Sequence, residues 1–283
     1  MEPTEIKDLK LKANIFRQQI LDMIVKNKGG HIASAFSLVE ILVSLYYKIL
    51  NIDPKNPKWE NRDRFILSKG HGGAALYVTL AEKGVFPKSV LDTFCQPKSI
   101  LGGHPDMLKI PGVEASTGSL GHGLPIAIGI SLAAKTDQKN YQTYCVVGDG
   151  ECQEGSIWEA VMCAAHYKLD NLTVIVDYNK LQACGPICEI NDPEPFLEKW
   201  RLFGWEAGEV DGHNIEEIIS TLKKVPFKKD KPTAIIAHTV KGKGVSFMEG
   251  VSKWHSMLPD DKELKLAQEE LKNSEAQLKE SKK

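Results

Sequence analysis

Two glycine-rich signatures of nucleotide-binding enzymes are missing from this sequence. It has no GxxxxGK[ST] phosphate loop and no GxGxxG run that opens a helix after a strand, which disfavours a P-loop triphosphatase and a dinucleotide-binding enzyme. Long apolar runs are missing too: stretches such as 172–176 are far shorter than the roughly 20 residues that cross a bilayer. The amino terminus, MEPTEIKDLKLK, is charged and has no apolar signal core. We therefore expect no membrane association.

The sequence also lacks an excess of charge of one sign. Its 283 residues include 36 Lys and Arg against 37 Asp and Glu, a formal net charge of −1, whereas nucleic-acid-binding proteins usually carry a clustered basic excess. The six cysteines form no CxxC pair, so a zinc site or a disulfide framework is the less favoured interpretation. We expect a cytoplasmic protein with reduced thiols and no nucleic-acid partner.

Segments with strand and helix patterns alternate along the chain. Buried strands are predicted at 143–147 and 172–176, with a helix between them from Ser156 to about Tyr167. Such a βαβ unit implies parallel strands with helices packed on the sheet. Further strands are predicted at 64–67 and 233–237, and further helices at 5–28, at 124–134, from Ser37 to about Leu50 through a capping box, and from Asn214 onward. The predicted fold class is α/β, with a doubly wound, mainly parallel sheet and helices on both faces.

The domain organisation follows from composition. No Pro-, Ser- or Gly-rich linker divides the body of the chain, so residues 1–258 are expected to form one domain. From about residue 260 the sequence is rich in Lys and Glu, with Leu264, Leu271 and Leu278 seven residues apart. Residues 259–283 are therefore predicted to be a charged helix or tail; a surface helix or a frayed tail is favoured over a partner-binding helix.

Polar residues follow the predicted strands at the points where ligands bind in open parallel sheets. Gly148-Asp149-Gly150 follows the strand at 143–147, and Asn179 follows the strand at 172–176. A GDG triplet alone is more often a turn than a site, but a carboxylate and a carboxamide at successive strand ends suit Mg²⁺ completed by phosphate oxygens and water. The helix expected near Ser156 would point its amino terminus at the same place, which favours bound anions.

The spacing of these residues resembles a known motif. Gly148-Asp149-Gly150 followed after 28 residues by Asn179 is similar to the thiamine-diphosphate motif, and several other segments resemble transketolases in the order found in that family. The resemblance covers about residues 10 to 258. The matching segments are 30–31 with 37–38, NRDRFILSKGH at 61–71, 103–105, TGSLGHG at 117–123, 153–155 and VDGH at 210–213.

The resemblance implies a thiamine-diphosphate-binding fold and a metal site. Asp149, the Asn179 side chain and the Leu181 carbonyl would hold Mg²⁺, which Ca²⁺ or Mn²⁺ could replace, on the diphosphate of thiamine diphosphate. Gly118, Leu120 and Gly150 would line the cofactor.

Histidines and one glutamate complete the implied site. His31 and His104 would contact the substrate, His71 would lie between diphosphate and substrate, and His255 would bind diphosphate and touch the substrate. Neutral imidazoles suit this work because they exchange protons near pH 7. Glu154 would join a carboxylate network between two active sites, although an acidic residue in a first helical turn explains it nearly as well.

Three other histidines are expected to have structural roles. His166 and His238 are predicted to be structural, and His213 is expected to order a turn before its helix.

The implied reaction is reversible transfer of a two-carbon ketol unit from a ketose phosphate to an aldose phosphate. In transketolases the pyrimidine-side glutamate comes from a second domain, and nothing after residue 258 resembles one. A separate subunit with the pyrimidine-binding domain is therefore expected, in an α2β2 heterotetramer that is active only when assembled. Leu- and Ala-rich helices, including the one after Gly123, are expected at the interface.

Three alternatives stay open. The α subunit of a 2-oxo acid dehydrogenase E1 component shares the GDG and a following Asn, but it typically has a paired Asn-Asn and lacks NRDRFILSKGH. Synthases of 1-deoxyxylulose 5-phosphate are normally one long chain. A non-catalytic paralogue would be expected to lose Asp149 or Asn179, and both are present.

Overall fold

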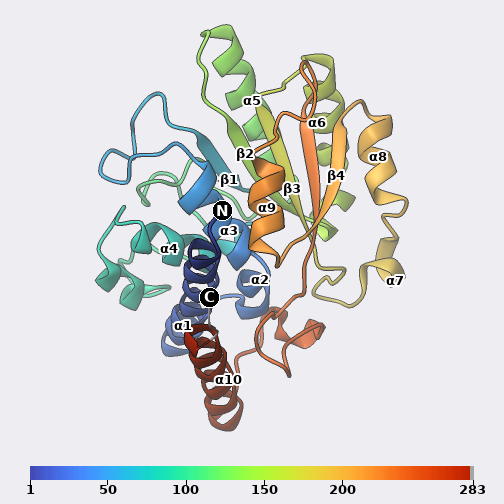
Figure 1. Ribbon diagram of the computed structural model, residues 1–283. Helices are drawn as coiled ribbons and strands as arrows, with labels where there is room; N and C mark the ends of the chain where they lie inside the picture. Colours follow the sequence, from blue (N-terminus) through green and yellow to red (C-terminus); the bar gives the residue numbers. More distant parts are fainter. Residues whose placement is uncertain (281–283) are drawn as a thin grey trace.

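The computed structural model describes residues 1–280 and contains a five-stranded sheet in which all neighbouring strands are parallel (Figure 1). The strand order is β1-β2-β3-β5-β4. Parallel strands place all their carboxyl ends at one edge of the sheet, where the site is expected. The strands are β1 Arg64–Leu67, β2 Thr143–Gly148, β3 Leu172–Tyr178, β4 Glu206–Asp211 and β5 Thr233–His238.

Helices cover both faces of the sheet, which confirms the predicted α/β class (Figure 1). Side chains of β2 and β3 alternate between two apolar clusters: Val146 and Ile175 belong to one, Val147 and Val176 to the other. Strands buried on both faces read as continuous apolar runs. One cluster includes α1 Pro3–Asn27, α2 Ile32–Phe36, α3 Val39–Ser44, α4 Gly73–Glu82 and α9 Ile215–Leu222; the other includes α5 Gly123–Thr136, α6 Gly155–His166 and α8 Phe196–Leu202.

Short helical segments connect these elements. They are Leu45–Ile49, Gly70–Gly72, Lys88–Thr93, Gly150–Gln153, Ser252–His255 and α7 Ile187–Asn191.

Two of the three helix starts predicted at a capping residue are wrong in detail. Ser37 follows α2 instead of capping a helix, and its hydroxyl donates to Asp177 at 2.7 Å. The Ser156 hydroxyl donates to the Gly121 carbonyl at 2.9 Å, within a helix that begins at Gly155. Both hydroxyls bind groups distant in sequence, which a local capping pattern does not reveal. The third start is confirmed, since the Asn214 side chain accepts from the backbone N–H of Glu217.

Strand β4 is not predicted by the sequence pattern. It is the edge strand next to β5, and within Glu206–Asp211 only Val210 is buried. The sequence EAGEVD therefore has neither the apolar run of a central strand nor a clear alternation.

The charged carboxyl-terminal segment forms helix α10, Asp261–Glu280, which packs along α1 (Figure 1). Ala267 and Leu271 are fully buried, and the Gln18 amide donates to Glu275 at 2.7 Å. Residues 261–280 therefore form a packed surface helix; the domain limit at 258 stays a prediction.

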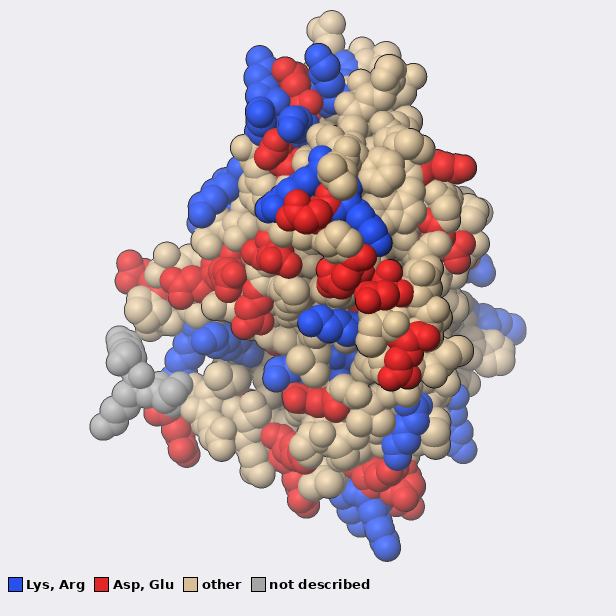
Figure 2. Space-filling model, turned by 90° about the vertical axis from the view of Figure 1, so that its right-hand side faces the viewer, with Lys and Arg blue, Asp and Glu red and all other residues tan. Residues whose placement is uncertain are grey.

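The surface of the protein mixes charges. On the face shown in Figure 2, acidic and basic side chains are interspersed with uncharged ones. Within residues 1–280, no helix combines the length and apolar character needed to cross a membrane.

Candidate active site at the carboxyl ends of the strands

A cavity of about 260 Å³ lies beyond the carboxyl ends of β2 and β3. Eight residues predicted for the site line it, so the fold brings together segments spread over most of the chain. They are His71, Leu120, Asp149, Gly150, Glu154, Asn179, Leu181 and His255. The other three predicted residues adjoin these, because His31 and His104 belong to one cluster of imidazole rings and Gly118 packs on the His104 ring.

Asp149 and Asn179 are fixed by backbone donors. Asp149 accepts from the N–H groups of Gly150 at 2.7 Å and Lys180 at 2.5 Å. The Asn179 side-chain oxygen accepts from the N–H of Leu181 at 3.1 Å. These bonds fix a carboxylate and a carboxamide that line one cavity together with Leu181, and such oxygens suit a hard divalent cation.

Burial and a nearby negative charge raise the pKa of Asp149 to about 6. Desolvation is the main cause, and the Asp177 carboxylate adds to it. Asp149 is therefore ionised at pH 7 against an unfavourable environment, which a bound cation would relieve.

Asp177 is the centre of a buried polar cluster beneath the cavity. Its carboxylate is paired with the Lys69 ammonium and accepts from the Ser37 and Thr239 hydroxyls. Burial alone would raise its pKa, but these partners, Lys69 foremost, hold the pKa of Asp177 below its ordinary value. Lys69 also lines the cavity, so this pair forms part of its floor.

Lys241 is a second buried cation at the cavity. Its ammonium donates to the carbonyls of Leu181 at 3.2 Å and Gln182 at 3.3 Å, and lies 2.9 Å from Nδ1 of His255. Burial and the charge of Lys69 lower the pKa of Lys241 to about 8. The charge of Lys69 is compensated by Asp177, so it is the buried ammonium of Lys241 that favours an anionic ligand.

Four histidines from distant segments form one cluster. The ring centroid of His31 lies 5.8 Å from that of His71, 5.9 Å from His104 and 5.1 Å from His255. Burial is the main cause that lowers the pKa of His31, of His71 and, to about 4, of His255. These three imidazoles are therefore neutral at pH 7, which agrees with the predicted use of neutral imidazoles.

Glu151 joins three segments of the site. Its buried carboxylate accepts from the Ser68 hydroxyl, from the Gly121 N–H at 2.9 Å and from the Gly148 N–H at 3.0 Å. It thereby fixes the loop that carries Leu120 against the end of β2. Glu154, by contrast, is exposed at the rim of the cavity.

Buried polar atoms without protein partners test whether the cofactor fits. Ser34 Oγ, His31 Nδ1 and Gln182 Nε2 are buried and have no hydrogen-bond partner within the described part of the chain, and Ser34 and Gln182 line the cavity. Buried polar atoms of this kind are normally satisfied, so they fit a polar ligand. Among residues 1–280 no three His, Cys, Asp or Glu side chains cluster as a metal site, and a cation here needs oxygens from its ligand. A metal-bound diphosphate fits both observations.

Eight cavity residues had no predicted role in the site: Ser34, Lys69, Gly148, Glu151, Gln153, Gln182, Ala183 and Lys241. Lys241 follows β5, and its place just after a buried strand was a usable signal. Lys69 follows β1 and gave the same signal, whereas Ser34 gave none, because α2 reaches the cavity only through tertiary packing.

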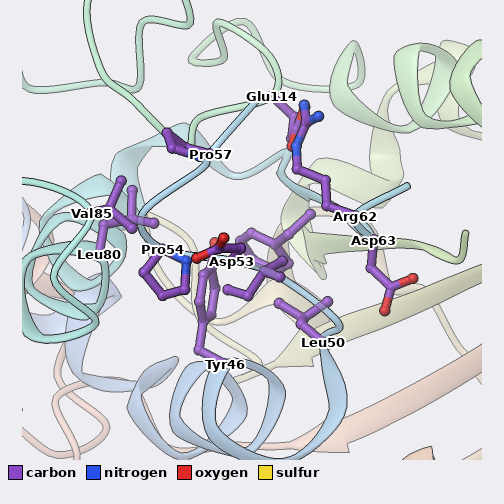
Figure 3. A pocket seen from close by; sticks show the side chains of 13 residues that line it. Tyr46, Leu50, Asp53, Pro54, Pro57, Arg62, Asp63, Leu80, Val85 and Glu114 are labelled. Atoms are coloured by element: carbon purple, nitrogen blue, oxygen red, sulfur yellow. The ribbon is translucent and has the colours of Figure 1, made fainter. Parts of the chain in front are cut away.

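A second cavity of about 30 Å³ lies away from these residues (Figure 3). Its walls are mainly apolar, with Tyr46, Leu50 and Leu80 among them. The guanidinium of Arg62 is paired with Glu114 through hydrogen bonds of 2.7 and 2.6 Å. Arg62 and Glu114, which line the cavity, are thus paired with each other. This small cavity therefore does not point to a ligand.

The fold and site together define an α/β protein with a polar cavity, lined by buried carboxylates and lysines, at the carboxyl ends of its parallel strands. Comparison with known protein families identifies this class more closely. Residues 9–278 match the family described as transketolase, thiamine diphosphate binding domain. The chain belongs to this family.

The relatives include proteins named as transketolase subunits. The chain is 44% identical over 255 residues to one of the subunits of the apulose-4-phosphate transketolase of Phocaeicola vulgatus, covering 90% of each chain. It is 44% identical over 269 residues to the 6-deoxy-6-sulfo-D-fructose transketolase subunit SqwG of a Clostridium species, covering 95% of this chain and 98% of the relative.

Solved structures agree with the fold. Transketolase from Campylobacter jejuni superposes with a TM-score of 0.88 at 33% identity, over 98% of this chain and 46% of that one. The chain thus spans about half the length of that transketolase chain.

Proposed function

We propose that this chain binds Mg²⁺ and the diphosphate of thiamine diphosphate as the amino-terminal subunit of a transketolase. One observation carries the proposal. Asp149, Asn179, Leu181 and Lys241 line the same cavity, where the Lys241 ammonium donates to the Leu181 carbonyl. The first three would hold the cation, Lys241 would face the diphosphate, and Gly118, Leu120 and Gly150 would leave room for the cofactor. The cofactor supplies the electron sink for cleavage of the carbon–carbon bond next to a ketose carbonyl.

The protein's own part is orientation and proton transfer. His31 and His104 would donate to the carbonyl and hydroxyl oxygens of the sugar, and His71 and His255 would lie between the sugar and the diphosphate. Neutral imidazoles can serve because they donate at one nitrogen and accept at the other. Glu154 at the rim would join a carboxylate network that reaches another subunit.

The substrate class is a ketose that donates a two-carbon unit to an aldose. The named relatives act on apulose 4-phosphate and on 6-deoxy-6-sulfo-D-fructose, so the donor here is either a sugar phosphate or a sugar with another anionic group. The reaction would take place in the cytoplasm.

A separate subunit with the pyrimidine-binding domain would complete the enzyme as an α2β2 heterotetramer. Support comes from the relatives named as subunits and from an apolar stripe on α5. Pro125, Ile126, Gly129 and Ala133 are exposed on that helix, and Met162 is exposed on the adjacent α6. We propose that this stripe contacts another subunit of the assembly.

Calorimetry tests the cofactor proposal directly. Thiamine diphosphate titrated into the chain mixed with its partner subunit is expected to bind in Mg²⁺ and to bind far more weakly in EDTA. Unphosphorylated thiamine serves as the control, because it lacks the groups that Mg²⁺ and Lys241 would hold. Equal binding of thiamine and thiamine diphosphate would refute the proposed diphosphate site.

Substitution on α5 tests the interface. Ile126→Lys is expected to weaken assembly with the partner at least about tenfold, since a buried unpaired charge is costly at an interface. Leu202→Lys on α8 is a matched control, because Leu202 is also an exposed apolar residue. Analytical ultracentrifugation measures both; equal assembly of the two variants would place the interface elsewhere.

A further inference from the structure

We infer that His213 is a positioning residue for the cofactor site, acting through the backbone of Val240 to fix Lys241. The inference rests on the proposed function, because it assigns Lys241 to the cofactor diphosphate. It also gives a role to the Asp211-Gly212-His213 triplet beyond the ordering of a turn that the sequence predicts.

The connection begins with a buried ion pair between two helices. The Arg17 guanidinium of α1 donates to both carboxylate oxygens of Glu40 on α3, at 2.7 and 2.6 Å, and also to the Phe36 carbonyl at 3.1 Å. Arg17 and Glu40 are both buried. Burial would raise the pKa of Glu40, but the charge of Arg17 and the bond from His213 hold it at about 2. Glu40 is thus a fixed, ionised acceptor.

This acceptor selects one tautomer of His213. Nδ1 of His213 lies 2.9 Å from Glu40, and Nε2 lies 2.8 Å from the backbone nitrogen of Val240. A backbone N–H can only donate, so Nε2 must be the unprotonated acceptor. The ring proton therefore belongs on Nδ1, where Glu40 accepts it. Both ring nitrogens are satisfied only in this neutral form.

The other end of the connection is the loop after β5. Val240 is bound by His213, and Lys241, the next residue, reaches the Leu181 and Gln182 carbonyls at the cavity. The N–H of Gly242 then donates to the Ala33 carbonyl at 3.0 Å. Val240 and Gly242 thus anchor the backbone on both sides of Lys241, and His213 supplies the first anchor.

The residues before His213 allow this approach. The Gly212 N–H donates to the His238 carbonyl at 2.8 Å, and a Cβ at Gly212 would lie 2.4 Å from the Thr239 methyl group. Asp211 accepts from the N–H of His213 at 2.8 Å. Glycine therefore permits close contact between the loops after β4 and β5, and Asp211 sets the direction of His213.

The test is a double-mutant cycle on the two-subunit enzyme. His213→Leu removes the acceptor for Val240 and is expected to raise the KM for thiamine diphosphate about tenfold, as loss of an outer-shell partner typically does, with a smaller change in kcat. In a Lys241→Ala background the same substitution is expected to change the KM by about twofold or less. If His213→Leu raises the KM by the same factor with and without Lys241, the inference is wrong.

Further variants separate positioning from loss of fold. His213→Gln can still accept from Val240 and donate to Glu40, so it is expected to restore most of the KM even if His213→Leu is unstable; no rescue would contradict the inference. His238→Leu is the matched control, because His238 is an exposed histidine paired with Glu209, and it is expected to leave the KM unchanged. If the wild-type enzyme binds no thiamine diphosphate, the proposed function itself fails. If the wild-type enzyme binds it normally but the effects of the His213 and Lys241 substitutions on the KM are independent, only the inference about His213 fails.

Discussion

Asp149→Asn is expected to abolish Mg²⁺-dependent binding of thiamine diphosphate while leaving the ligand-free chain as stable as wild type, or more stable. The carboxamide cannot supply the negative charge that a divalent cation needs. The pKa of Asp149 is raised to about 6 in the folded chain, against an ordinary value of 3.8. At pH 7 this elevation corresponds to an unfavourable term on the order of 2 to 3 kcal/mol. Asparagine removes that term but loses one of two backbone hydrogen bonds, which costs about 1 kcal/mol.

The pH dependence of unfolding provides a second measurement. Because the folded-state pKa of Asp149 lies above its unfolded value, the folded chain binds the proton more tightly between pH 4 and 6. The contribution of Asp149 to the free energy of unfolding is therefore full below pH 4 and is lost as the pH rises through 6. Urea unfolding of ligand-free protein should show this loss in wild type and in the surface control Asp8→Asn, but not in Asp149→Asn. Mg²⁺-dependent cofactor binding by Asp149→Asn would contradict the assignment of Asp149 as a ligand.

Asp177→Asn is expected to lower the free energy of unfolding by about 3 to 5 kcal/mol, because removing one partner of a buried ion pair leaves the other uncompensated. The group left without its partner is the ammonium of Lys69, which is 1% exposed. Replacing both residues, as Lys69→Met with Asp177→Asn, should recover much of the loss, since no unpaired charge is then buried. Urea unfolding of the three variants measures the coupling.

A surface pair provides the comparison for this experiment. Glu209→Gln breaks the contact with His238, in which both side chains are more than 40% exposed, and should cost at most about 1 kcal/mol. If Asp177→Asn lowers the free energy of unfolding by no more than Glu209→Gln does, water must reach Lys69. The interpretation of the Lys69–Asp177 pair as a buried floor of the site would then be wrong.

Local sequence patterns predicted the parts of the fold that depend on near neighbours. The central strands β2 and β3 were predicted because both faces are buried and their residues are continuously apolar. Asp149 and Asn179 were predicted because they directly follow those strands. Edge strand β4 was missed because Val210 alone is buried in it.

The parts that escaped prediction depend on contacts between distant segments. Lys69 and Asp177 are 108 residues apart, and Glu151 binds Ser68 across 83 residues. The hydroxyls of Ser37 and Ser156 looked like helix caps, yet each binds a group far along the chain. A polar residue has one local sequence environment but many tertiary partners, so its sequence neighbours do not determine its role.

The opposite pKa shifts of Asp149 and Lys241 have a consequence for the order and strength of ligand binding. Lys69 and Asp177 compensate each other, so a cation entering alone would meet the positive charge of Lys241, and an anion alone would meet the negative charge of Asp149. A cation and a diphosphate together would neutralise both of these charges. Their binding should therefore be positively cooperative, and thermodynamic reciprocity requires that each raise the affinity for the other by the same factor. The site would thus favour a matched ion pair over either ion alone.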